Sequence, residues 1–243
     1  MMIRTLILIG MLLLGWQALV VFLQLPMYLL PSPLQVAQSA IMHFPLLIHE
    51  MWPTLYEILL GFSLGVLTGL LGGLLIASFK PLRRWLLPLM IISQAMPTFA
   101  IAPLLVLWVG YGLSSKIITA IMMIFFPVAS AFYDGLTNTP KAMLALAEIQ
   151  GGKPMQVLYH IRIKAALPRL ASGIRIAAVI APMGAIIGEW VGSSQGLGYL
   201  MLSANARMEV DLMFAALSIV IIMALLLYFT IDCLLKKYIW WTI

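Results

Sequence analysis

The chain has 243 residues, of which 63% are hydrophobic and 9% are charged, and its formal net charge is +6. Soluble domains have about 45–50% apolar and about 25% charged residues, so this composition excludes a soluble protein and indicates an integral membrane protein. The single cysteine, Cys233, excludes a disulfide within the chain and a cysteine-based metal site.

Six apolar stretches are long enough to cross the bilayer core, which takes about 20 helical residues. None alternates apolar and polar residues with period 2, as the strands of a membrane β-barrel do. The predicted fold class is therefore an all-α integral membrane protein with about six transmembrane helices in a single domain, residues 1–243, whose core helices span about 54–235. The six stretches lie at residues 5–23, 54–79, 85–109, 117–138, 171–190 and 213–235.

The first stretch follows Arg4 and imitates a secretory signal. It is too long for the apolar region of such a signal, and no Ala-x-Ala cleavage pattern follows it, so we expect an uncleaved helix.

Residues 34–43 come next, between prolines. They are compatible with an amphipathic helix on the membrane surface or with a simple connector.

The second stretch carries glycine at every fourth position, which places these glycines on one helix face. A face without side chains lets a neighbouring backbone approach closely. We expect a packing seam that serves a contact within the chain rather than a dimer contact. The glycines are Gly61, Gly65, Gly69 and Gly73.

Prolines interrupt the third and fourth stretches, at Pro88, Pro97, Pro103 and Pro127. Each proline removes a backbone donor, and irregular backbone at membrane depth is tolerated where it meets protein or water. Such breaks suit helices that line a pathway, although prolines are also common in membrane helices generally. The candidate pathway residues are Gln94, Met96, Phe99, Phe125, Phe126 and Ser130, together with Glu189.

Two acidic residues, Glu57 and Glu189, lie near the outer ends of their predicted helices. An ionised carboxylate at the bilayer centre costs at least ~2.5 kcal/mol, so both are expected to face protein or water near the interface. Anchoring of a helix end or a loop is favoured over a role in proton relay.

One polar, basic segment, residues 139–168, separates the fourth and fifth stretches; we call it the coupling loop. Thr139 is a candidate N-cap with Pro140 at the first helical position, and Gly151 or Gly152 can end this helix with a positive φ. A second short helix is predicted from Pro154 to just before Pro168. The two helices form a knob, which favours docking of another protein.

All but two of the fourteen Lys and Arg residues fall at the N-terminus or in alternate loops, the exceptions being Lys116 and Arg207. This positive-inside pattern places both termini and the coupling loop in the cytoplasm. The positive charge therefore reports orientation, and a nucleic-acid partner is not expected.

Enzyme motifs are absent from the sequence: it contains no H-E-x-x-H, no G-x-S-x-G and no phosphate-cradling G-x-x-x-x-G-K-[ST]. The three histidines, His43, His49 and His160, are scattered. We therefore expect no catalytic residue, no metal site and no ATP hydrolysis by this chain.

The coupling loop resembles the EAA loop of binding-protein-dependent ABC transporter permeases. Gly151, Gln156, Ile161 and the AALP run at 165–168 match that loop, whereas Lys164 replaces a proline. The segment Ala145-Leu146-Ala147 stands where the family has Glu-Ala-Ala, and Glu148 is displaced by three residues. Three further segments resemble the nitrate, sulfonate, taurine and thiamine-precursor permeases: LPSP at 30–33, residues 95–116 and GLGYLM at 196–201.

This resemblance implies a type I ABC importer in the bacterial inner membrane. Such an importer contains two permease subunits, here expected to be a homodimer, two cytoplasmic ATPase subunits and an extracytoplasmic solute-binding protein. ATP and Mg²⁺ belong to the ATPase partner, so no cofactor is expected on this chain. The residues expected to couple to the ATPase are Glu148, Gly151, Gly152, Met155, Gln156 and Tyr159.

The substrate is indicated by residues 188–217, which resemble the subgroup that handles pyrimidine precursors of thiamine. Sulfonate, taurine or nitrate is the alternative substrate class. An ion-coupled secondary transporter is the alternative protein class, but the chain has neither an internal repeat nor ionisable residues placed at mid-membrane depth. A membrane scaffold without transport leaves the proline-rich stretches unexplained.

Overall fold

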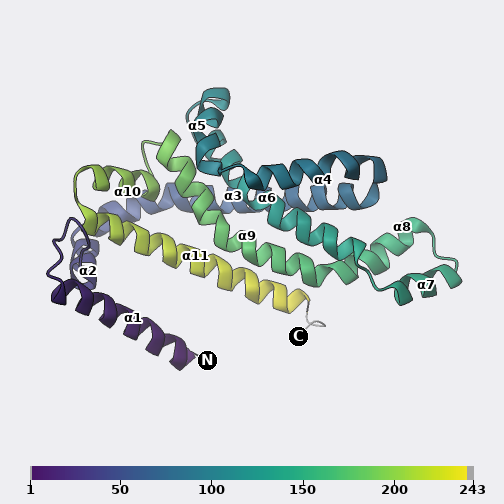
Figure 1. The fold of residues 1–243 in the computed structure, drawn as a ribbon, viewed down its shortest axis with the longest axis horizontal. Coiled ribbons are helices and arrows are strands. Elements are labelled where there is room, and N and C mark those ends of the chain that lie inside the picture. The colour runs from purple at the N-terminus through teal and green to yellow at the C-terminus, as the bar shows by residue number, and fades with distance from the viewer. Residues whose placement is uncertain (1, 240–243) are drawn as a thin grey trace.

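The computed structural model describes residues 2–239, and every regular element within them is a helix (Figure 1). Five of the six apolar stretches each lie on one main helix, and the third is divided between two. The elements are α1 (Met2–Phe22), α2 (Pro33–Met42), α3 (Phe44–Ser78), α4 (Lys80–Ala95), α5 (Thr98–Val109), α6 (Leu113–Thr137), α7 (Lys141–Ile149), α8 (Pro154–Val157), the π-helical turn η1 (Leu158–Arg162), α9 (Ile163–Gly192), α10 (Leu197–Ala206) and α11 (Val210–Tyr238).

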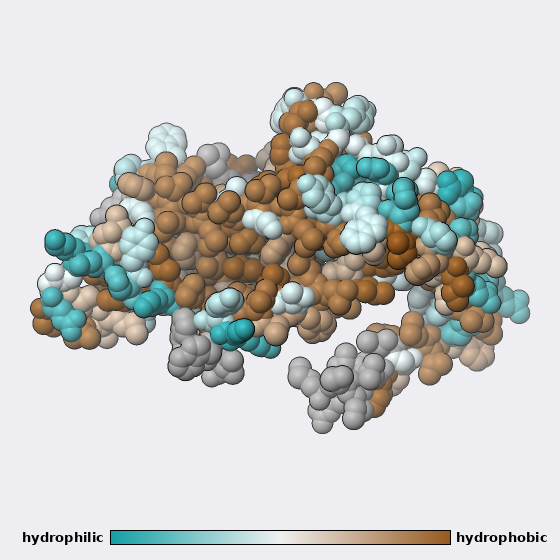
Figure 2. All heavy atoms as spheres, turned by 180° about the vertical axis from the view of Figure 1, so that it is seen from behind, coloured by the Kyte–Doolittle hydropathy of each residue, from teal (hydrophilic) through white to brown (hydrophobic). Residues whose placement is uncertain are grey.

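Among residues 2–239, four helices are long and apolar enough to cross a membrane: α3, α6, α11 and the continuous helix from Pro154 to Gly192. Two shorter apolar helices, within α1 and at α5, accompany them. Apolar side chains fill the middle of one face of the molecule, and hydrophilic side chains gather towards its two ends (Figure 2). This distribution is the one that a bilayer requires of a helical membrane protein.

Helix α6 lies at the centre of the bundle and packs most extensively against α3 and α9. The expected glycine seam faces it: a Cβ added at Gly65 would lie 2.7 Å from a side-chain carbon of Ile124, and one at Gly69 would lie 2.7 Å from Val128. The seam therefore serves a contact within the chain, as expected.

A second small-residue face, on α9, packs against the other side of α6. A Cβ at Gly184 would lie 2.7 Å from Cα of Ala120, and one at Gly188 would lie 2.8 Å from Cα of Lys116. Helix α6 is thus held between two helices whose small residues allow backbone approach. Gly184, Gly188 and Gly192 recur at every fourth position of α9, so the sequence carries the same signal here as on α3.

The prolines break the helices less often than the sequence indicates. Pro88, Pro103 and Pro127 lie inside the helices α4, α5 and α6, so the expectation that these three prolines break the third and fourth stretches is wrong. Pro53 likewise lies inside α3. A proline removes one backbone donor, and the remaining hydrogen bonds of a long helix preserve its course. The third stretch does divide, at Met96 and Pro97, where both residues are extended.

Candidate functional site

The first helix of the coupling loop, α7, begins at Lys141 with Pro140 in the N-cap position. Thr139 is not the N-cap, in contrast to the sequence-based prediction. Its Oγ1 donates a hydrogen bond to the carbonyl oxygen of Leu136 at 3.1 Å, so this side chain closes the end of α6 instead.

The turn after α7 needs both glycines, for different reasons. Gly151 has φ +69°, a conformation that residues with a Cβ adopt at a cost. Gly152 donates its N–H to the carbonyl oxygen of Ala147 at 2.9 Å, and a Cβ at Gly152 would lie 2.9 Å from that same oxygen. A Cβ at Gly151 would meet nothing within 4 Å, so a side chain there would project outward.

The sequence predicts that the second helix of the coupling loop ends just before Pro168. The structure contradicts this prediction. The helix begins at Pro154, where the Gln156 side chain accepts a hydrogen bond from the Lys153 N–H at 3.1 Å, and continues through η1 into α9. Pro168 lies inside α9. The coupling loop is therefore joined to the fifth apolar stretch by unbroken helix, which can carry a displacement of the loop into the bundle.

The six residues expected to contact an ATPase are all exposed on the coupling loop: Glu148, Gly151, Gly152, Met155, Gln156 and Tyr159. Large apolar side chains accompany them, among them Ile149, which is 84% exposed, and Met155, which is 63% exposed. A cavity of about 550 Å³ lies beside them, between α7 and the start of α9. Exposed apolar groups beyond the membrane helices are typical of a protein interface.

A buried polar network lies at the other end of the bundle, away from the coupling loop; we call it the far-end network and define it as Glu50, Thr54, Glu57, Lys116 and Glu189. Lys116 Nζ donates to Glu57 Oε1 at 2.5 Å and to Ser193 Oγ at 2.8 Å. The Lys116 and Glu57 side chains are only 5% and 3% exposed. A lysine buried this deeply requires such a partner.

Glu189 is fully buried and ties the loop after α9 to α3. Its carboxylate accepts hydrogen bonds from Thr54 Oγ1 at 2.6 Å and from the Gly198 N–H at 2.5 Å. The Gly196 N–H donates to Glu50 Oε2 at 2.5 Å. These N–H groups belong to the start of α10, where unpaired donors and the helix dipole favour carboxylates. The contacts are those of the loop anchor that the sequence favours.

Close packing explains the glycines in the GLGYLM segment. Gly196 has φ +106°, and a Cβ at Gly198 would lie 2.7 Å from Glu189 Oε2. Neither position therefore accommodates a side chain without displacing the buried carboxylate.

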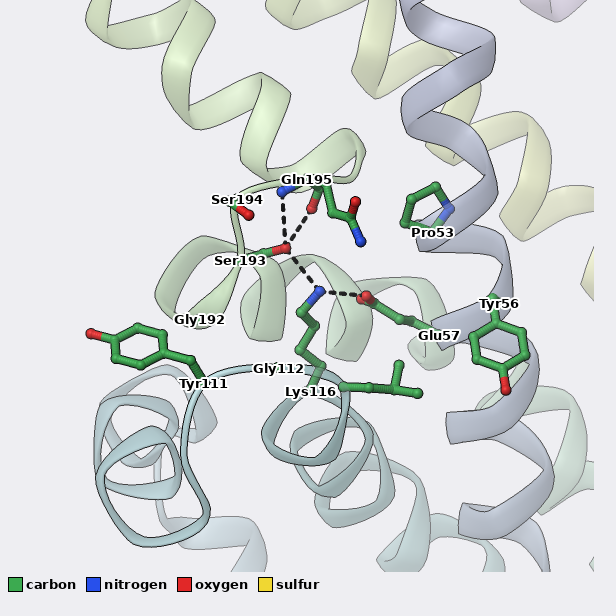
Figure 3. A pocket seen from close by; sticks show the side chains of 11 residues that line it. Pro53, Tyr56, Glu57, Tyr111, Gly112, Lys116, Gly192, Ser193, Ser194 and Gln195 are labelled. Atoms are coloured by element: carbon green, nitrogen blue, oxygen red, sulfur yellow. Dashed lines mark hydrogen bonds and ion pairs between the residues drawn. The ribbon is translucent and has the colours of Figure 1, made fainter.

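A cavity of about 620 Å³ opens beside the far-end network, between α3, the turn before α6 and the loop after α9 (Figure 3). Lys116 and Glu57 point towards one another at its wall, and Tyr56 and Tyr111 flank it. The sequence does not indicate this site, because Lys116 precedes the fourth apolar stretch and resembles a loop residue, whereas it lies in the first turn of α6.

The candidate pathway residues fall into two sets. Gln94, Met96 and Phe99 are exposed around the break between α4 and α5. Phe125 and Phe126 are half-buried and pack against a cluster of α3, α4 and α6 side chains, and Ser130 is half-buried one turn further along α6. Glu189 belongs to the far-end network, not to either set.

Residues 2–239 thus form a helical membrane bundle with an exposed helix–glycine–helix loop, the architecture expected of a permease subunit. Residues 61–238 match the family described as "Binding-protein-dependent transport system inner membrane component", and the chain belongs to this family of ABC transporter permeases. It is a transport subunit and not an enzyme, since ATP hydrolysis in such transporters takes place on separate subunits.

Individual relatives agree with this assignment. A probable ABC transporter permease of Haemophilus influenzae is 52% identical, over 98% of each chain. The formylaminopyrimidine transport permease of Halalkalibacterium halodurans is 34% identical, over 82% of this chain and 80% of its own length. A putative aliphatic sulfonates transport permease of Bacillus subtilis is 30% identical, over 77% and 68%.

The fold is also that of a solved transporter. A chain of the MetNI methionine ABC transporter, in an inward-facing conformation, superimposes with a TM-score of 0.69. The match covers 80% of this chain and 97% of that chain, at 21% sequence identity.

Proposed function

We propose that this ABC importer permease moves a pyrimidine precursor of thiamine. The similarity to the formylaminopyrimidine permease carries the proposal, because it is higher than that to the sulfonate permease and covers more of the chain. The charges support it: Lys116, the basic residue at the wall of the far-end cavity, is paired with Glu57 and offers no unpaired cation to a sulfonate. A neutral heteroaromatic ring needs only apolar and aromatic walls with a few polar groups.

The proposed assembly contains a second copy of this chain, two ATPase subunits and a solute-binding protein. The exposed coupling loop docks on the ATPase through Glu148, Gly151, Gly152, Met155, Gln156 and Tyr159. Because α8, η1 and α9 are one helix, closure of the ATPase pair tilts the fifth apolar stretch. ATP and Mg²⁺ bind to the ATPase subunits.

The proposed pathway runs along the break between α4 and α5. Gln94, Met96 and Phe99 are exposed there and face the second copy in the proposed homodimer. Phe125, Phe126 and Ser130 lie behind them on α6. The far-end network holds the outer ends of α3, α6 and α9 together while the route opens and closes.

Uptake by cells that lack the gene tests the substrate. A thiamine-pyrimidine auxotroph should need this gene to grow on limiting formylaminopyrimidine, and its use of taurine or an alkanesulfonate as sulfur source should not change. Loss of sulfonate use with unchanged precursor uptake would instead assign the sulfonate class and leave the permease assignment intact.

A further inference from the structure

A second polar cavity lies at the coupling-loop end of the bundle, between α9 and α11. Its volume is about 410 Å³. One wall is a single face of α9, and the other is formed by the last turn of α11 and the residue that follows it. The lining residues are Pro168, Ala171, Ser172, Arg175, Leu235, Lys236 and Ile239.

The cavity carries excess positive charge. Arg175 Nε donates to Asp232 Oδ1 at 2.7 Å, and Lys236 Nζ donates to Asp232 Oδ2 at 2.7 Å. One carboxylate thus faces two cations. The two terminal nitrogens of Arg175 donate to no acceptor among residues 2–239, although the side chain is only 29% exposed. A guanidinium with both terminal nitrogens free matches the oxygens of a phosphate group.

The depth of the cavity matches the boundary between lipid tails and headgroups. Lys236 is the first basic residue after the apolar run of α11, and Asp232 lies one helical turn, about 6 Å, deeper. Val179, on the same face of α9 as Arg175 and one turn further into the bundle, is 50% exposed. An apolar surface therefore continues directly from the basic cavity into the hydrocarbon region.

We propose that this cavity binds the headgroup phosphate of an anionic phospholipid, with Arg175 and Lys236 as its cationic contacts and the acyl chains along α9. Basic pockets between transmembrane helices are suited to such headgroups. A free phosphate ester would use the same cations, but the apolar surface that continues past Val179 favours the lipid.

Native mass spectrometry of the detergent-purified chain, mixed with equal amounts of phosphatidylglycerol and phosphatidylcholine, tests the site. We expect Arg175→Gln and Lys236→Gln each to retain about fivefold less phosphatidylglycerol, the factor that corresponds to one basic residue near an anionic surface. Lys237→Gln is the matched control, because it removes the same charge from an exposed residue outside the cavity. Equal retention by all three variants would overturn the proposal.

Two further arms separate this role from alternatives. Asp232→Asn removes the carboxylate that competes for both cations, so it should increase phosphatidylglycerol retention, whereas a purely structural ion pair would lose it. Added glycerol 1-phosphate should not displace the lipid at equal concentration. Displacement by this soluble ester would assign the cavity to a free phosphate ester and contradict the lipid proposal.

Discussion

At the scale of single residues, the far-end network depends on one lysine. Lys116 is the charge that compensates Glu57, and both side chains are almost completely buried. The sequence indicated that Glu57 and Glu189 lie at helix ends and anchor a loop. It did not indicate their lysine partner, because a residue at the start of a helix looks like a loop residue until the neighbouring helices are placed around it.

Removing the lysine should destabilise the bundle. Lys116→Met leaves Glu57 buried without its partner, and breaking a buried pair in this way costs about 3–5 kcal/mol. We expect a clear fall in the thermal unfolding midpoint of the purified chain. Arg207→Met is the control, since it breaks an exposed pair with Glu209 and should change the midpoint little. Equal midpoints for the two variants would mean that the network does not hold the helices.

At the scale of helices, the central position of α6 depends on small residues of both neighbours. The regular glycines of α3 predicted one of these faces from sequence alone. The face on α9 carries the same signal, since Gly184, Gly188 and Gly192 also recur every four residues, but the sequence does not show which helix this face contacts. The continuity of α3 and α6 through their prolines was also not predictable, since it depends on the hydrogen bonds that remain around each proline.

Overpacking this seam should be costly. Gly184→Leu would force α9 away from the backbone of Ala120, and insertions into a packed core cost about 1–3 kcal/mol or more. Gly15→Leu is the matched control, because a Cβ at Gly15 meets nothing within 4 Å. We expect the yield of monodisperse protein in size-exclusion chromatography to fall for the first variant only. Equal yields would show that α6 and α9 can move apart without any loss of folded protein.

At the scale of the whole molecule, the two ends of the bundle must lie on opposite sides of the membrane if the coupling loop is to meet a cytoplasmic ATPase. The far-end network and the coupling loop occupy these two ends, and basic residues concentrate at the coupling loop. Composition and charge predicted the helical class and the loop. The contacts that join α3 to α6 and to the loop after α9 could not be predicted, because their partners lie more than 50 positions apart, as Glu57 and Lys116 do.

Single cysteines in a Cys233→Ala background test this orientation. Ser114→Cys and Ser194→Cys place exposed thiols at the far end, and Gln150→Cys places one on the coupling loop. An impermeant thiol reagent added to intact cells should label the first two variants and spare the third, which should react only after the cells are opened. Labelling of Gln150→Cys in intact cells would reverse the orientation.

The most direct measurement of the central claim is substrate-stimulated ATP hydrolysis by the complete transporter in proteoliposomes, with Gly151 variants of this chain. Gly151→Trp meets no atom of the chain within 4 Å at its Cβ, so apart from the cost of a Cβ at positive φ it should leave the fold intact while projecting a large ring from the docking face. Gly151→Ala places a Cβ at the same positive φ, so it carries the same backbone cost without the large ring. We predict that the alanine variant keeps most of the stimulation and that the tryptophan variant loses it. Full stimulation with the tryptophan variant would contradict coupling through this loop.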